Sequence, residues 1–144
     1  MIHFEVCGWP APQGSKTRMP NGAMLDGGSK GARDRHKNWR SAVADTARDI
    51  AQHDDVAAPL DGPLYVRLSF RFPMPARRPK KVRDYGEAFK TSAPDLDKLI
   101  RATLDGLTAG GLIADDRYVA ELYATKWEFT GWVGCNISIG PCEP

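Results

Sequence analysis

Apolar and polar residues alternate in three segments of this chain, the pattern of a strand with one buried face. The clearest runs from Leu64 to Phe72, where every second residue is apolar. Met1 to Gly8 and Val133 to Ile139 alternate in the same way, and Val119 to Phe129 is also predicted to be a strand. Thr130-Gly131 separates the last two and is typical of a turn. We therefore expect four strands.

Two further segments carry apolar residues at helical spacing. From about Asp34 to His53, one stripe contains Trp39, Val43, Ala47 and Ile50. A second stripe contains Leu96, Leu99, Ile100, Leu104 and Leu107. Pro94 disfavours helical backbone before it, so the second helix is predicted to begin near Asp95 to Asp97. Gly110-Gly111 predicts where it ends.

The order strand, helix, strand, helix, strand, strand predicts an α+β fold. We expect a single domain over residues 1–144, a mixed sheet of about four strands with two main helices packed on it. Gly8 to Gly31 is rich in Gly and Pro and is predicted to be a long loop. Within it, Gly14-Ser15-Lys16-Thr17 lacks the full spacing of a phosphate-binding loop, so no nucleotide cofactor is expected.

Composition narrows the class of protein. Of 144 residues, 42% are hydrophobic and 26% are charged, as in ordinary globular chains. No apolar run reaches the roughly 20 residues that a membrane helix needs, and no signal peptide pattern precedes the first strand. The three cysteines form no Cys-x-x-Cys pair, which argues against a disulfide framework or a zinc site. We expect a cytoplasmic protein.

The net charge of +2 conceals two basic segments. Residues 12–40 hold seven Lys or Arg against two Asp, and residues 76–90 hold six against two acidic residues. Such segments bind DNA phosphates, although they also occur as solvated surface without a partner. The candidate contacts are Lys16, Arg18, Arg33, Arg77, Arg78, Lys80, Lys81, Arg83 and Lys90, with Lys98 from the second helix. Tyr85 and Phe89 lie among them and would either stack on bases or anchor the segment to the core.

Carboxylates cluster in the sequence after the second basic segment. Asp95 and Asp97 lie at the start of the second helix, and residues two apart share a face while the backbone is extended. Asp115 and Asp116 follow the far end of that helix. Close carboxylates repel unless a cation neutralises them, and oxygen ligands suit Mg²⁺, with Mn²⁺ as a substitute. An Asp at this position is also common as a simple helix cap.

These residues resemble the RusA family of Holliday-junction resolvases. The resemblance rests on Pro94-Asp95-Leu96-Asp97-Lys98-Leu99-Ile100-Arg101, Leu104-Asp105-Gly106-Leu107, Asp115-Asp116, a lone Lys126 in a strand, and Trp9-Pro10-Ala11-Pro12. It implies a small homodimeric, Mg²⁺-dependent endonuclease, often encoded by a phage, that cuts four-way DNA junctions. It also implies that Asp95, Asp97 and Asp116 bind the metal.

Two positions depart from the family pattern. Lys98 stands where Asn is usual, and Arg101 stands where a functional Lys is usual. Arg101 can stabilise charge on a phosphate but does not release a proton near neutral pH, whereas Lys126 can supply a titratable amine. Lys126 also fits the role of a surface lysine. Two alternatives stay open: a metal-dependent nuclease for other branched DNA, and a catalytically inactive junction-binding protein.

Overall fold

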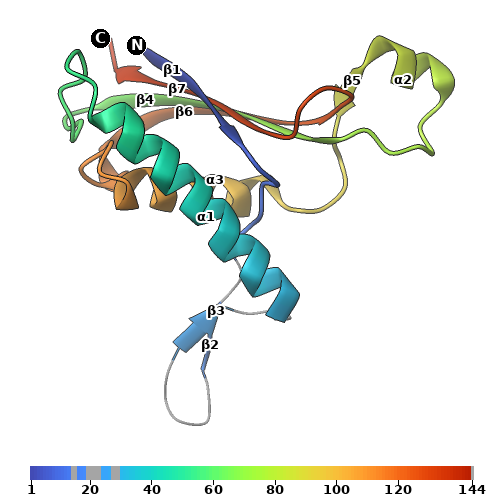
Figure 1. Ribbon diagram of the computed structural model, residues 1–144, viewed down its shortest axis with the longest axis horizontal. Helices are drawn as coiled ribbons and strands as arrows, with labels where there is room; N and C mark the ends of the chain where they lie inside the picture. Colours follow the sequence, from blue (N-terminus) through green and yellow to red (C-terminus); the bar gives the residue numbers. More distant parts are fainter. Residues whose placement is uncertain (14–15, 19–23, 27–29, 144) are drawn as a thin grey trace.

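The fold is described from a computed structural model that covers residues 1–13, 16–18, 24–26 and 30–143; for residues 16–18, 24–26 and 32 it describes the backbone only. A five-stranded mixed sheet runs through the molecule in the order β1-β7-β4-β6-β5 (Figure 1). Its strands are β1 (Ile2–Cys7), β4 (Leu64–Pro73), β5 (Glu87–Phe89), β6 (Val119–Phe129) and β7 (Gly134–Pro141). β4 and β6 are parallel, and the other neighbours in this sheet are antiparallel.

The alternation in β4 produces a sheet with two different faces. Leu64, Val66, Leu68, Phe70 and Phe72 are all buried, and the residues between them are half-buried or exposed. Since successive side chains point to opposite faces, the buried set faces the helices and the other set faces away. Lys126 and Glu128 pair in register with Phe70 and Phe72, so both lie on the helix-covered face.

Helices α1 (Lys30–Ala51) and α3 (Leu96–Ala109) cover one face of the sheet (Figure 1). Trp39 of α1 is 1% exposed and donates a 3.1 Å hydrogen bond from its indole nitrogen to Thr103 of α3. The two helices approach closely at Gly106, where an added Cβ would lie 2.7 Å from the Cβ of Val43. α1 also contacts β1 and α3 contacts β6, so the two helices lie side by side on the sheet.

The sequence prediction was right about the α+β class and the four long strands, but it missed smaller elements. Glu87–Phe89, predicted to be loop, is the fifth strand of the sheet. α2 (Lys80–Tyr85) also lies in the predicted basic loop. A hairpin of β2 (Lys16–Arg18) and β3 (Met24–Asp26) lies in the predicted loop Gly8 to Gly31, and α1 begins four residues before Asp34.

Two expectations from composition can be compared with the structure. Cys7, Cys135 and Cys142 are all free thiols. Among the helices that the structure describes, none is both long enough and apolar enough to cross a membrane.

Candidate active site

Asp95 and Asp97 lie where α3 begins, as predicted. Asp95 has extended backbone at the N-cap position, and Asp97 is in the first helical turn. The Asp95 carboxylate makes no capping hydrogen bond, so it is not held by the helix backbone as an ordinary cap would be. Both side chains are exposed, and the Lys98 ammonium lies 3.9 Å from Asp95. Both carboxylates lie at the positive end of the helix dipole.

One face of α3 carries charges of alternating sign. Asp97, Arg101 and Asp105 are spaced four residues apart, so they follow one another along the helix surface. Thr108 continues the same face one turn later. The sequence prediction assigned roles to Asp97 and Arg101 and none to Asp105.

Asp116 meets this face at its C-terminal half. The Thr108 hydroxyl donates a 2.5 Å hydrogen bond to the Asp116 carboxylate. Burial raises the pKa of the Asp105 carboxyl, and the neighbouring Asp116 carboxylate raises it further. Arg40 and Arg101 act in the opposite direction on the same pKa. The two carboxyl groups are therefore close enough to interact strongly.

A pocket of about 440 Å³ opens beside this pair. It is lined by Gln13, His36, Arg40, Asp105, Thr108, Ala109, Asp115 and Asp116. Carboxylates come from α3 and from the turn before β6, whereas Arg40 comes from α1. The pocket therefore offers oxygen ligands and a guanidinium group to the same volume.

The structure places the four predicted metal-binding carboxylates in two groups. Thr108 contacts Asp116 and lies eleven residues after Asp97 on α3. That spacing is about 16 Å along the helix axis at 1.5 Å per residue. Asp115 accepts a 2.9 Å hydrogen bond from the amide of Arg117 and caps the short 3₁₀ helix η1 (Asp116–Tyr118). Within the described part of one chain, no three His, Cys, Asp or Glu side chains are grouped to hold a metal ion. The donors are nonetheless carboxylate oxygens, which fit a hard divalent cation.

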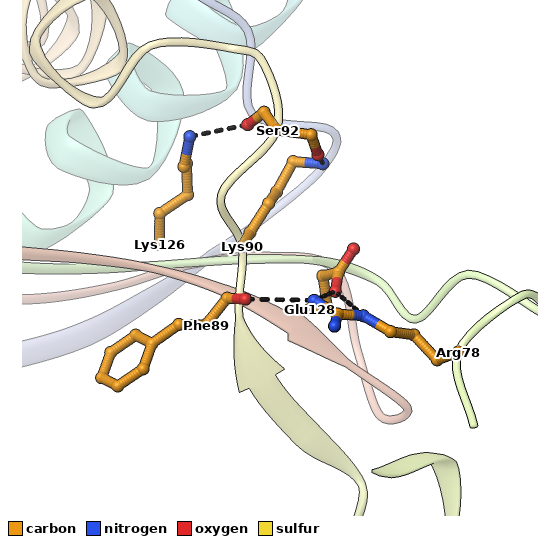
Figure 2. A network of polar contacts seen from close by, with 6 residues as sticks. All are labelled: Arg78, Phe89, Lys90, Ser92, Lys126 and Glu128. Carbon is orange, nitrogen blue, oxygen red and sulfur yellow. Dashed lines mark hydrogen bonds and ion pairs between the residues drawn. The ribbon is translucent and has the colours of Figure 1, made fainter. Parts of the chain in front are cut away.

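Lys126 holds the segment that leads into α3. Its ammonium donates 2.7 Å hydrogen bonds to the carbonyl oxygens of Ser92 and Pro94, and Figure 2 shows the side chain reaching from β6 to Ser92. Two of its three protons are thereby used on backbone next to Asp95. The structure supports a positioning role for Lys126, in addition to the charge that it brings near the carboxylates.

Arg78 is fixed to a buried carboxylate. Its guanidinium is ion-paired with Glu128, whose side chain is 2% exposed, and also donates a 3.3 Å hydrogen bond to the carbonyl of Phe89 (Figure 2). Lys90 lies in the same network, where its ammonium donates to the hydroxyl of Ser92. Burial lowers the pKa of Lys90, while the charge of Glu128 raises it. The basic segment is thus attached to β6 at this point.

The remaining predicted DNA contacts have different surroundings. Arg77, Lys80, Lys81 and Arg83 are exposed, although Lys80 is ion-paired with Asp84 at 2.6 Å. Arg33 is half-buried on α1. Lys16 and Arg18 lie on β2, and their side chains are outside the part of the chain that the structure describes.

Aromatic side chains accompany these basic residues. Phe89 stacks on Trp127 with ring centroids 4.1 Å apart but remains 62% exposed, and Tyr85 is 78% exposed. Phe89 therefore anchors β5 to β6 and still presents a face to solvent.

Sequence reasoning missed three residues near the candidate site. Asp105 could have been found from its spacing of four residues from Arg101 and eight from Asp97. Glu128 could have been noted as an acidic residue on the apolar side of a predicted strand. Gln13 follows the Trp9-Pro10-Ala11-Pro12 segment, and no local pattern indicates that it reaches the pocket.

Comparison with known proteins gives one family. The family model described as Endodeoxyribonuclease RusA matches residues 24–139, which is most of the chain. No curated protein matches this sequence.

Proposed function

This chain belongs to the RusA family of endodeoxyribonucleases, which resolve Holliday junctions, and from that premise we propose that it resolves four-way DNA junctions by Mg²⁺-dependent, paired symmetric nicks. The observation that carries the proposal is the row of charged side chains on α3, where Asp97, Arg101 and Asp105 lead to Asp116. Carboxylates beside guanidinium groups suit a phosphodiester substrate. The carboxylates can hold a cation that attracts phosphate, and the guanidinium groups attract phosphate directly.

Asp95 and Asp97 are the proposed metal ligands at the start of α3, and Asp116, with Asp115 beside it, is the proposed ligand at the far end of the helix. Within one chain these two groups are too far apart to hold the same cation. Mg²⁺ held by these carboxylates would supply a Lewis acid for activating water and for stabilising the leaving oxygen. Arg101 follows Asp97 by one helical turn and is placed to stabilise negative charge on the scissile phosphate. Lys126 keeps the Asp95 segment in place through the carbonyls of Ser92 and Pro94.

The basic residues around α2 and Arg33 on α1 are proposed to bind the DNA arms. Exposed Arg77, Lys81 and Arg83 surround the segment that leads to Asp95. Phosphate contacts of this kind supply affinity and orientation and do not select sequence. Tyr85 and Phe89 add exposed rings on which an unpaired base at the junction can stack.

A homodimer would match the two-fold symmetry of a four-way junction. Among the described residues, β5 pairs only with residues 127–129 of β6, so the edge of β6 at residues 119–125 has no strand partner there. Leu122 and Tyr123 on this edge are 43% and 51% exposed. We propose that this C-terminal edge contributes to the dimer, which would act on bacterial or phage DNA in recombination, repair or DNA processing.

A second candidate is a junction-binding protein that does not cleave. It is favoured by Lys98, whose ammonium lies 3.9 Å from the Asp95 carboxylate and partly substitutes for a cation. Because Lys98 and Asp95 are 46% and 67% exposed, solvent screens this pair strongly, so we favour the nuclease.

The proposal is tested with a labelled synthetic four-way junction and a linear duplex of matching sequence. The native chain is expected to nick the junction in Mg²⁺ and to leave the duplex intact, and EDTA or Asp97→Asn is expected to abolish nicking. Tight junction binding without nicking in Mg²⁺ or Mn²⁺ would favour the second candidate. Cleavage of the linear duplex would keep the metal-dependent chemistry and remove the junction specificity.

A further inference from the structure

We propose that Trp9 is a specificity-determining residue, whose exposed indole ring stacks on an unpaired DNA base at the branch point of a junction. This role rests on the junction-resolving function proposed above, and it adds a contact that separates branched DNA from a linear duplex. A fully paired duplex keeps its bases stacked inside the helix, whereas strands that exchange at a branch point expose base faces.

Trp9 is exposed although the chain next to it is buried. Its side chain is 58% exposed, whereas Pro10 is buried and Ala11 is 2% exposed. Trp39, by contrast, is 1% exposed and is hydrogen-bonded in the core. A single exposed apolar side chain is common in proteins, so the exposure of Trp9 matters here because of how its ring is held and what lies beside it.

The segment that carries Trp9 is fixed at both ends. The amide of Gly8 donates a 3.2 Å hydrogen bond to the carbonyl of Val133, between β6 and β7. The amide of Gln13 donates a 3.3 Å hydrogen bond to the carbonyl of Lys98, in the first turn of α3. The segment therefore leads to the end of α3 that carries the first pair of carboxylates, and its ring is presented on a held backbone. A group that is already in place loses little conformational entropy when it binds.

The Trp9 ring lies against Phe72 at the end of β4. The two ring centroids are 6.4 Å apart with an interplanar angle of 77°, which is an edge contact. Phe72 itself is only 3% exposed, so it supports the indole from the core. Because rings in an edge contact do not cover each other completely, at least one face of the indole is clear of Phe72. That face can receive a base.

A positive charge lies against the same phenylalanine. The Lys90 ammonium is 5.1 Å from the centroid of Phe72 and donates a 2.9 Å hydrogen bond to the hydroxyl of Ser92. Ser92 is three residues before Asp95, so Lys90 connects the aromatic contact to the segment that enters α3. A DNA strand whose base stacks on Trp9 can therefore place a phosphate near the Lys90 ammonium. An aromatic ring with a neighbouring cation is the combination that binds unpaired strands.

The contact is tested by photochemical crosslinking of the full chain to synthetic four-way junctions in EDTA, which prevents metal-dependent cleavage. One junction carries 5-iododeoxyuridine at the branch point, and a second carries it in the middle of an arm. On irradiation this base crosslinks to an aromatic ring that stacks on it, and mass spectrometry of the digested complex identifies the residue. We expect a crosslink at Trp9 from the branch-point base and none from the base within the arm.

Two substitutions separate stacking from packing. Trp9→Leu keeps an apolar side chain against Phe72 and removes the ring, whereas Trp9→Phe keeps a ring. Trp9→Leu is expected to weaken junction binding about tenfold and to leave binding of a linear duplex of the same sequence unchanged. Trp9→Phe should recover most of the junction affinity. Urea denaturation of both variants measures folding, and a purely structural role would weaken binding of both DNAs in step with stability.

Native junction affinity in Trp9→Leu, or no crosslink at Trp9 from the branch-point base, would overturn the proposal. A changed oligomeric state of Trp9→Leu in sedimentation velocity, with equal loss of junction and duplex binding, would assign the ring to a contact between copies and also overturn it. If the native chain cuts junctions while Trp9→Leu binds them normally, the stacking contact is wrong and the nuclease stands. If Trp9 crosslinks at the branch point but junctions are not cut in Mg²⁺, the contact stands and the resolvase proposal fails.

Discussion

The Lys126 ammonium on β6 donates a 2.7 Å hydrogen bond to the carbonyl oxygen of Pro94, the residue immediately before Asp95. A second bond of 2.7 Å joins the same ammonium to the carbonyl of Ser92. The backbone that enters α3 is thereby attached to β6 of the sheet. This contact links the position of a predicted catalytic carboxylate to a side chain 31 residues further along the chain.

Replacing Lys126 by Met keeps the length of the aliphatic chain and removes both hydrogen bonds. We expect the free energy of unfolding to fall by about 1–2 kcal/mol, since these bonds are charge-assisted but partly exposed. Junction cleavage should fall more than junction binding, because the Asp95 segment loses its anchor. Urea denaturation and parallel cleavage and binding titrations measure the three quantities. Lys37→Met, on the exposed face of α1, is the control for a lost surface charge, and an equal effect of both substitutions would contradict the anchoring role.

Arg77 and Arg78 are neighbours in sequence with different expected roles. Arg77 is exposed, whereas Arg78 neutralises the buried carboxylate of Glu128. Arg77→Gln should therefore weaken junction binding and reduce the dependence of log K on log salt by about one unit, with little change in stability. Arg78→Gln should lower the free energy of unfolding by about 3 kcal/mol, because it leaves a buried charge without its partner.

The salt dependence is measured from junction binding at several salt concentrations, and the free energy of unfolding is measured by chemical denaturation, each for both variants. Should Arg78→Gln change the salt dependence and leave stability intact, Arg78 would be a phosphate contact and the anchoring role of the ion pair would be wrong.

The sequence predicts a strand or helix well where one buried face gives the apolar residues a regular spacing. It predicts site residues well where they lie close together in a short motif. Leu64 to Phe72 was predictable as a strand because one face of β4 is buried along its whole length. Glu87–Phe89 was not, since three residues give no period and their strand conformation depends on pairing with Trp127 to Phe129 of β6.

The same distinction applies to the candidate site. Asp95 and Asp97 were placed correctly because Pro94 and the apolar stripe of α3 define where the helix begins. The proximity of Gln13 to Asp105 depends on how the segment after β1 packs beside α3, which the local sequence does not encode. The parallel pairing of β4 with β6 is non-local in the same sense.

The close approach of α1 and α3 makes Gly106 sensitive to substitution. A Cβ at this position would lie 2.7 Å from Val43 and 3.0 Å from the carbonyl oxygen of Arg40, so the helices would have to move apart. Gly106→Ala is expected to lower the free energy of unfolding by about 1–3 kcal/mol despite the better helix propensity of Ala. Thermal or urea denaturation measures this change. A stability equal to or above that of the native chain would mean that the interhelical contact is looser than described.

The three free cysteines should differ in reactivity. Burial raises the pKa of Cys135 above its usual range, so its thiol stays protonated at pH 8 and is shielded from reagents. Cys7 is exposed and should react readily with a disulfide reagent such as 5,5′-dithiobis(2-nitrobenzoate). Cys135 should react only after denaturation in guanidinium. Mass spectrometry of the labelled peptides identifies each site, and rapid labelling of Cys135 in the native protein would contradict its burial in the sheet.

The most direct test of the central proposal uses a supercoiled plasmid whose inverted repeat extrudes a four-way junction. A dimer that makes paired nicks should convert this plasmid in Mg²⁺ directly to the linear form, with cuts at symmetric positions across the junction. Asp97→Asn and addition of EDTA should both prevent linearisation, and relaxed plasmid without the extruded junction should stay uncut. Accumulation of nicked circles without linear product, or equal cutting of the relaxed plasmid, would contradict symmetric resolution of four-way junctions by this protein.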